Sequence, residues 1–296
     1  MDIRRYLVEH VTRYRYDAVV EAVYNRSYLR PRDTDYQRVL TSALAVTPEP
    51  DQLTEHVDYF GNHTAYLETR EPHTDYEVAC RSTVEVCWPA PDLGELDHHT
   101  VGQAASQLAS AADPLLVADF IMPSPLVALT SEVRSFAAEV LAGDRLLGET
   151  LDELQRRIHD EFAYRTGATS VMTTLDEVLE LRSGVCQDFA HLAVGCLRAA
   201  GLPARYVSGY LETEPAPGTE KLRGADASHA WVSVLTPSAG WVDLDPTNAQ
   251  FADSRYIVTA WGRDFSDVSP LRGLVYTEAT HSELTVEVDV TPLGED

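Results

Sequence analysis

Over about the first 88 residues, apolar, aromatic and β-branched residues gather in short segments, which is typical of β-strands. Turn-forming residues divide this stretch, and the pair Gly61-Asn62 falls where a hairpin tip would lie. The segments rich in Val, Tyr, Thr and Leu cover residues 3–16, 19–29, 38–47, 55–69 and 76–88. The pattern predicts a small antiparallel sheet or sandwich.

A helical pattern replaces the strand pattern after a proline-rich stretch at residues 89–91. Between about residues 100 and 200, apolar side chains recur at helical spacing, for example over residues 131–141. Thr150 and Thr174 are each followed three positions later by a glutamate, which is the spacing of a capping box. The sequence therefore predicts that one helix begins at each threonine.

Strand-like segments return after residue 203, at 204–211, 229–236, 241–245, 256–260 and 283–290. Residues 214–224 contain two prolines and two glycines, which predicts a loop that forms either a substrate rim or an ordinary surface loop. Strands, helices and strands in that order are typical of the α+β class. We expect a β-rich N-terminal domain over residues 1–90 and a second domain, including the C-terminal strands, over residues 91–296.

One predicted helix carries a cysteine in its first turn. From Cys186 onward the apolar residues have the spacing of a buried helix face, at Phe189, Ala190, Ala193, Val194 and Leu197. Ser183 and Gly184 are predicted to form the cap and the turn before it, and Gly201 the end. At a helix start, free backbone N–H groups and the helix dipole favour a thiolate. A lone cysteine is more often a small buried side chain, so its partners decide its role.

Two neighbouring strands supply those partners. If 229–236 and 241–245 form an antiparallel hairpin, the register in which facing residue numbers sum to 474 places His229 opposite Asp245. A register shifted by two residues pairs His229 with Asp243 instead, on the same face. An acid beside a histidine fixes the tautomer of the ring and stabilises its protonated form. Cysteine, histidine and aspartate together are a nucleophile, a base and an orienting acid.

The charge and the cysteines exclude other functions. The formal net charge is −24 and the pI about 4.6, which disfavours nucleic-acid binding. The four cysteines show no zinc-binding spacing, so we expect free thiols, no metal and no cofactor. The chain shows no signal peptide and no apolar run of membrane-spanning length, so we expect a cytoplasmic protein with no membrane partner.

Four sequence blocks resemble the transglutaminase-like core of bacteria, and the segment before them resembles the β-rich N-terminal region that often accompanies it. The core blocks are residues 184–191, 201–210, 227–232 and 240–248, and the N-terminal likeness includes His10, Tyr14, Tyr16, residues 29–32 and residues 58–62. The resemblance implies a papain-like core, in which a helix bundle packs on an antiparallel sheet. It implies Cys186 as nucleophile, His229 as base and Asp245, the aspartate before Pro246-Thr247, as acid. Its backbone N–H makes Cys186 the first oxyanion donor, and Tyr164 or Gln187 is a candidate for the second.

These residues lead to a hypothesis of amide-bond acyl transfer through a thioester on Cys186. Water as acceptor makes the enzyme a peptidase or amidase, and an amine acceptor makes it a transglutaminase. The expected partner is a peptide or protein amide; an intracellular setting favours hydrolysis or a specialised amide exchange. The alternatives are a non-catalytic scaffold with the same fold, and a metal-assisted hydrolase that uses His191 and His229. The predicted directions of those two histidines do not converge, and His191 is expected to be structural. The sequence does not predict an oligomeric state.

Overall fold

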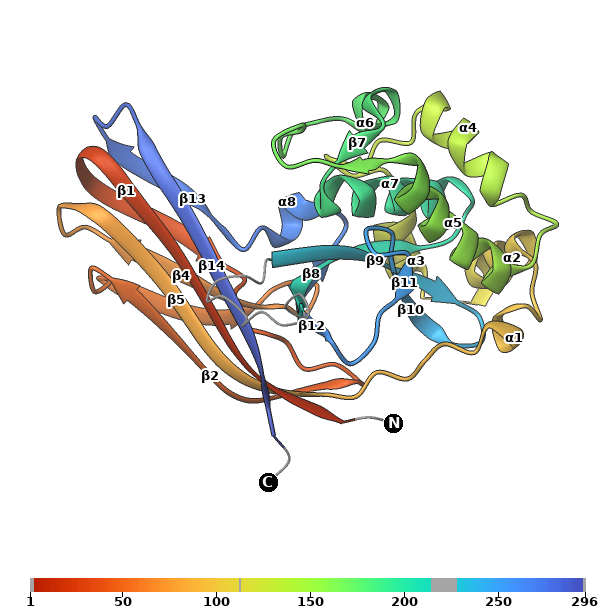
Figure 1. Cartoon of the computed structure of the whole chain (residues 1–296), viewed down its shortest axis with the longest axis horizontal. Helices are drawn as coiled ribbons and strands as arrows, with labels where there is room; N and C mark the ends of the chain where they lie inside the picture. The colour runs from red at the N-terminus through yellow and green to blue at the C-terminus, as the bar shows by residue number, and fades with distance from the viewer. Residues whose placement is uncertain (1–2, 112, 214–227, 295–296) are drawn as a thin grey trace, which may run out of the picture.

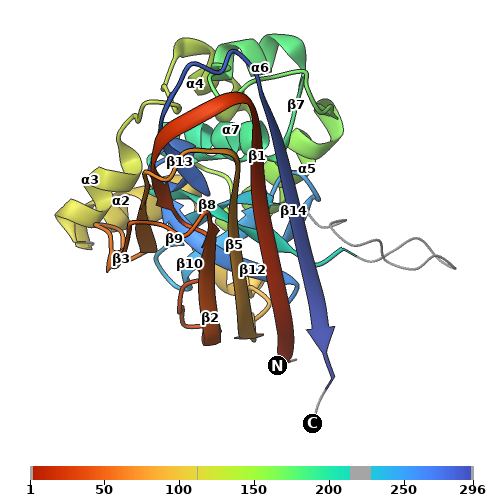
Figure 2. The same ribbon diagram turned by 90° about the vertical axis from the view of Figure 1, so that its left-hand side faces the viewer.

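The computed structural model describes residues 3–111, 113–213 and 228–294. The protein contains two antiparallel sheets and a layer of helices (Figure 1). The larger sheet contains seven strands in the described residues. They are β1 (Arg4–Ser27), β2 (Gln37–Thr47), β3 (Gln52–Val57), β4 (His63–Thr69), β5 (His73–Val86), β13 (Leu271–Thr277) and β14 (Ser282–Leu293). Figure 2 faces this sheet and shows β2, β5, β1 and β14 side by side. The predicted hairpin tip at Gly61-Asn62 is confirmed, because it connects β3 to β4.

The long strand β1 is the centre of this sheet. Its first half pairs with β5 and β14, and its second half pairs with β4 and β13. The prediction of two separate strands was therefore wrong: the chain bends between Arg15 and Val20 without ending the strand. The division at residue 90 placed the C-terminal strands in the second domain, but β13 and β14 complete the N-terminal sheet. Such long-range pairing leaves no trace in local periodicity.

A smaller sheet lies between the large sheet and the helices. Its strand order is β11-β10-β9-β8-β12, with β8 (Ala204–Leu211), β9 (Ser228–Thr236), β10 (Gly240–Asp245), β11 (Gln250–Phe251) and β12 (Tyr256–Gly262). The helices are α1 (Leu93–Leu96), α2 (Val101–Ala111), α3 (Pro114–Ile121), α4 (Ser131–Val140), α5 (Leu147–Glu161), α6 (Leu175–Leu181), α7 (Cys186–Ala199) and α8 (Phe265–Val268). Two short strands, β6 (Ala163–Tyr164) and β7 (Ser183–Gly184), form a parallel pair. The α+β class is confirmed.

The two predicted helix starts have different outcomes. Thr174 caps α6 in a complete capping box with Glu177, as expected. Thr150 lies inside α5, where its hydroxyl donates to the carbonyls of Leu146 and Leu147. That prediction was wrong because a buried threonine can bond back to the preceding turn of its own helix.

The two faces of the smaller sheet bury different cores. One face packs against the helices, with Val232 and Leu244 among its buried side chains. On the other side, Tyr210 and Ile257 pack with residues of β1, β5 and β14 in a second cluster. None of the helices in the described residues has the length and apolar character that a membrane span requires.

Two amide side chains fasten the N-terminal region to the edge strand β12. Gln37 Nε2 donates to the carbonyl of Val258 at 2.8 Å, and Val258 N–H donates to Gln37 Oε1 at 2.8 Å. Asn62 forms the same pair of bonds with Trp261, at 2.8 Å and 2.9 Å. Both amides are buried. They satisfy backbone groups that an edge strand otherwise leaves without partners.

We expect Gln37→Met to lower the free energy of unfolding by about 2–4 kcal/mol, because methionine keeps the volume but removes the bonds of Gln37 to the Val258 N–H and to the Arg32 carbonyl, both in buried residues. Urea unfolding measures the change. The matched control Gln52→Met, at an exposed position of β3, is expected to change the free energy by less than about 0.5 kcal/mol. Equal effects of the two substitutions would contradict the role given to Gln37.

Candidate active site

Cys186 is the first residue of α7, which packs against β8 and β9. Its side chain is partly exposed. The residue before the helix is Val185, so the prediction of Ser183 as cap was wrong; Ser183 and Gly184 instead form β7. The carboxylate of Asp188 takes the capping role, because its Oδ2 accepts the Val185 N–H at 2.8 Å. A Cβ at Gly184 would lie 2.7 Å from this carboxylate, which explains the glycine.

His229 and Asp245 meet on one face of the β9–β10 hairpin, as predicted. His229 Nε2 lies 2.7 Å from Asp245 Oδ2. The facing residues, such as Asp243 and Ser233, have numbers that sum to 476, so both predicted registers were wrong. The observed register differs from the first by two residues, which keeps every side chain on its face. His229 therefore reaches Asp245 diagonally rather than directly across the ladder.

The charges of the site favour a protonated imidazole ring. The Cys186 side chain lies close enough to the His229 ring to act on its charge and raise its pKa. Because Nε2 is bound to Asp245, Nδ1 is the nitrogen that remains for the sulfur. Burial disfavours the charged ring, but the charge and hydrogen bond of Asp245, together with Cys186, outweigh it and raise the pKa of His229 to about 10. Burial likewise opposes the charge of Asp245, yet the His229 charge and its hydrogen bonds hold the pKa of Asp245 below the ordinary value.

Five donors converge on the carboxylate of Asp245, which is fully buried. Besides His229, its Oδ2 accepts the Asn248 amide at 2.6 Å and the Tyr256 hydroxyl at 2.6 Å. Its Oδ1 accepts the backbone N–H groups of Thr247 at 2.8 Å and Asn248 at 3.3 Å. Neither Asn248 nor Tyr256 was predicted from the sequence. Thr247 lies at the Asx-turn spacing from Asp245 and Asn248 follows it directly, so a contact with Asn248 was open to prediction, whereas Tyr256 lies on another strand and gave no signal.

Asp243, the alternative acid, has a different partner. It accepts the indole N–H of Trp231 at 2.7 Å. The Trp231 indole stacks on the His229 ring at 6.1 Å between ring centres. A Cβ at Gly209 would lie 2.6 Å from this indole, so the glycine makes room for it. Trp231 therefore lies between Asp243 and the imidazole.

Two family models match this chain. The model of the transglutaminase-like superfamily matches residues 134–246, and that of the bacterial transglutaminase-like N-terminal region matches residues 6–85. An uncharacterized protein of Mycobacterium tuberculosis is 43% identical over 99% of this chain and 94% of its own length. The chain belongs to the transglutaminase-like superfamily.

Two further proteins are similar to this transglutaminase-like chain. A protein-glutamine gamma-glutamyltransferase of Pseudomonas aeruginosa is 37% identical over an alignment 136 residues long. The alignment covers 40% of this chain and 19% of that protein. A crystal structure from Cytophaga hutchinsonii, described as a candidate cysteine protease, covers 100% of this chain and 95% of its own, with a TM-score of 0.76 and 21% identity. The latter shows the shared papain-like fold.

The predicted oxyanion candidates both lie beside Cys186 in the transglutaminase-like core. Tyr164, in β6, pairs with Gly184 and is 55% exposed. Burial of its hydroxyl, with the charges of Cys186 and Asp188, raises the pKa of Tyr164. Gln187 is partly exposed, and its side chain has no hydrogen bond to another described residue. The assignment of the second donor stays a prediction.

His191 lies away from Cys186 in the transglutaminase-like core. Its Nε2 accepts the Phe265 N–H at 3.1 Å, and burial lowers the pKa of His191 to about 4, which keeps the ring neutral. His191 therefore connects α7 to α8. Among the described residues, no group of three or more His, Cys, Asp or Glu side chains is arranged to hold a metal ion. The predicted loop over residues 214–224 lies outside the described residues.

Proposed function

We propose that this protein is a cysteine-dependent enzyme that cleaves amide bonds through a thioester on Cys186. The observation that carries the proposal is that one imidazole, His229, is bound to Asp245 at 2.7 Å and is also acted on by Cys186 at the start of α7. A thiol that donates its proton to a neighbouring imidazole is a strong nucleophile at neutral pH. Papain-like folding and the glutamyltransferase relative support the same chemistry.

The reaction has two steps. The Cys186 thiolate attacks the amide carbonyl, and the carbon–nitrogen bond breaks as His229 gives its proton to the departing amine. Water or a second amine then attacks the thioester while His229 takes the proton of the attacking group, and the sulfur leaves as thiolate. Asp245 keeps the ring in the tautomer that both steps need. Water gives a peptidase or amidase, and an amine gives a transglutaminase.

Hydrolysis is the outcome that we favour. The preference rests on the expected cytoplasmic location, which stays a prediction, because bulk crosslinking would harm a cell's own proteins. The acceptor is resolved by offering a glutamine-containing peptide with monodansylcadaverine. We expect more glutamate formation than dansyl incorporation. The reverse ratio would assign the protein to the transglutaminases while leaving the cysteine mechanism in place.

Cys186→Ala is expected to abolish acyl transfer, with a loss of at least about 10³-fold in kcat for whichever amide in a panel of glutamine peptides and peptide amides reacts fastest. Ammonia or amine release measures the rate. Cys87→Ala is the matched control, because Cys87 is also a partly exposed free thiol, and it should retain the wild-type rate. Activity that persists in Cys186→Ala would refute the mechanism, and a wild-type protein inert toward the whole panel would favour a scaffold.

A further inference from the structure

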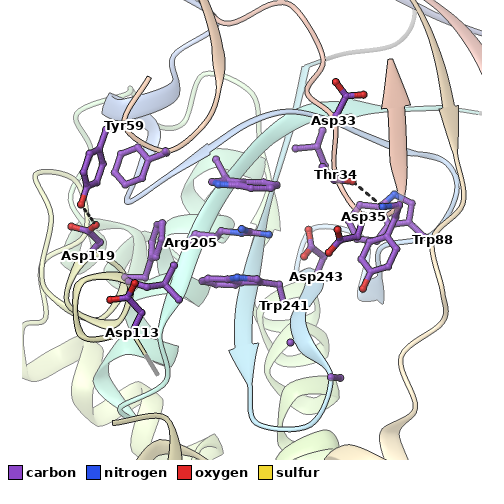
Figure 3. Close-up of a pocket in the computed structure, with 18 of the residues that line it drawn as sticks. Asp33, Thr34, Asp35, Tyr59, Trp88, Asp113, Asp119, Arg205, Trp241 and Asp243 are labelled. Atoms are coloured by element: carbon purple, nitrogen blue, oxygen red, sulfur yellow. Dashed lines mark hydrogen bonds between the residues drawn. The ribbon is translucent and has the colours of Figure 1, made fainter. Parts of the chain in front are cut away.

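A cavity of about 770 Å³ lies beside the smaller sheet, apart from the candidate active site (Figure 3). Its walls come from loops of the N-terminal region, from α3 and from the end of the β9–β10 hairpin. Cys186, His229 and Asp245 do not line it. Its volume is within the range of sites for small molecules. Nothing in the proposed acyl transfer assigns it a role.

The inner part of this cavity holds a buried arginine. Arg205 is 8% exposed, and its guanidinium lies between the indoles of Trp241 and Trp261, with 4.1 Å and 3.6 Å from its central carbon to the ring centres. Figure 3 shows the guanidinium pointing along the cavity toward Asp243 and Asp35. Within the described residues it forms no hydrogen bond and no ion pair, and its Nε is buried without a partner.

This arrangement leaves the guanidinium without a hydrogen-bond acceptor in the described part of the chain, although the charges of Asp243 and Asp35 act on it. Burial lowers the pKa of Arg205 to about 9, so the group stays charged at neutral pH. A guanidinium carries five N–H donors, and burying a donor without an acceptor, as at the Arg205 Nε, is unfavourable. Stacking on two indoles offsets part of that loss but supplies no acceptor. A carboxylate is the group whose planar geometry matches a guanidinium.

The rest of the lining has the opposite charge. Five aspartates line the cavity: Asp33, Asp35, Asp113, Asp119 and Asp243. In the described part of the chain, no basic group lies within ion-pair distance of any of them, and Asp35 is exposed without a hydrogen bond to another residue. A simple anion would meet these carboxylates, and a simple cation would leave Arg205 without an acceptor. A ligand that carries both charges satisfies both.

We propose that this cavity binds a small zwitterion, whose carboxylate pairs with Arg205 and whose ammonium group lies against Asp35 and the neighbouring aspartates. The aromatic walls contact the apolar part of the ligand. Two sources share this chemistry: a free amino acid, and a C-terminal lysine of a peptide, with its free carboxylate and side-chain ammonium.

Three probes of one chain length test the proposal on the wild-type protein: 6-aminohexanoate, hexanoate and hexylamine. Three of the four tryptophans line the cavity, so indole fluorescence reports binding, and calorimetry gives the dissociation constants. We expect 6-aminohexanoate to bind at least tenfold more tightly than either single-charge probe. Equal binding of hexanoate or of hexylamine, or no binding of any probe, would overturn the proposal.

Variants locate the site. Arg205→Met should weaken binding of 6-aminohexanoate at least tenfold, and Asp35→Asn at least threefold. The control is Arg32→Met. Arg32 packs on Trp261 but does not itself line the cavity, so this substitution should change binding less than threefold. Full affinity in Arg205→Met would overturn the proposal, and the wild-type series decides if that variant does not fold. The dissociation constants of L-lysine and N-acetylglycyl-L-lysine are compared in Cys186→Ala, which prevents turnover. Tighter binding of L-lysine indicates a free amino acid as the ligand, and tighter binding of the acetylated dipeptide indicates the C-terminal end of a peptide.

Discussion

Replacing His229 by alanine is expected to slow the alkylation of Cys186 by iodoacetamide at pH 6 by about 10- to 100-fold. An unassisted thiol, with an ordinary pKa of about 8.5, is only about 0.3% thiolate at that pH. The wild-type protein holds the sulfur at a helix start and beside an imidazole whose pKa is raised to about 10, so the proton can reside on the ring. The lower nucleophilicity of a stabilised thiolate reduces the gain, which sets the lower limit.

The other cysteines of the chain are internal references for this measurement. Burial raises the pKa of Cys80, and it raises that of Cys196 to about 12, so both should react slowly in wild type and variant alike. Peptide mass spectrometry from pH 5 to 9 gives each rate separately. If Cys186 reacts no faster than Cys87 in wild type, or if His229→Ala leaves its rate unchanged, the thiolate–imidazolium pair does not exist.

Much of the fold could be predicted from local patterns in the sequence. The apolar character of residues 204–211, 229–236 and 241–245 predicted β8, β9 and β10, which are buried along most of their length. Apolar character did not predict β13, whose side chains from Arg272 to Tyr276 are exposed, so that no apolar face marks the strand. The register of the hairpin was also beyond reach, since a shift of two residues preserves the pattern of faces.

The candidate site divides in the same way. Cys186, His229 and Asp245 were open to prediction because motif spacing and strand parity constrain them. The supporting side chains were harder to predict. Tyr256 comes from an edge strand, and Asp188, in the first turn of α7, bonds back to the Val185 N–H. Arg205 shows the limit most clearly, because its two indole neighbours lie 36 and 56 positions away in the sequence. Only the fold reveals that its guanidinium forms no hydrogen bond within the described residues.

Asp245→Asn is expected to lower kcat by about 10³- to 10⁴-fold, the scale of losing the acid in a comparable triad. All five groups that contact this carboxylate are donors. An asparagine would turn its NH₂ group toward either the backbone N–H groups of Thr247 and Asn248 or the cluster at Oδ2, so neither orientation satisfies the site. Without the negative charge, burial dominates, and the pKa of His229 should fall from about 10 to below the ordinary 6.5.

The sign of the stability change follows from the two pKa shifts. The raised pKa of His229 gives a contribution that is complete below about pH 6.5 and is lost as the pH rises through about 10. The lowered pKa of Asp245 gives one that is present above about pH 4 and is lost as the pH falls through its folded-state value. The difference in unfolding free energy between wild type and Asp245→Asn, about 3–5 kcal/mol for a broken buried pair, should therefore be largest between about pH 4 and 6.5.

Asp243→Asn is the matched control, because Asp243 is a buried aspartate two residues away on the same strand face, and it bonds to Trp231 rather than to His229. Its kcat should stay within about threefold of wild type, and an NMR titration of labelled histidine should find the pKa of His229 still near 10. If Asp243→Asn instead lowers that pKa and Asp245→Asn does not, the acid of the triad is Asp243. If neither variant moves it, the charge that holds the imidazole protonated is not a carboxylate of this hairpin, and the proposed mechanism loses its orienting acid.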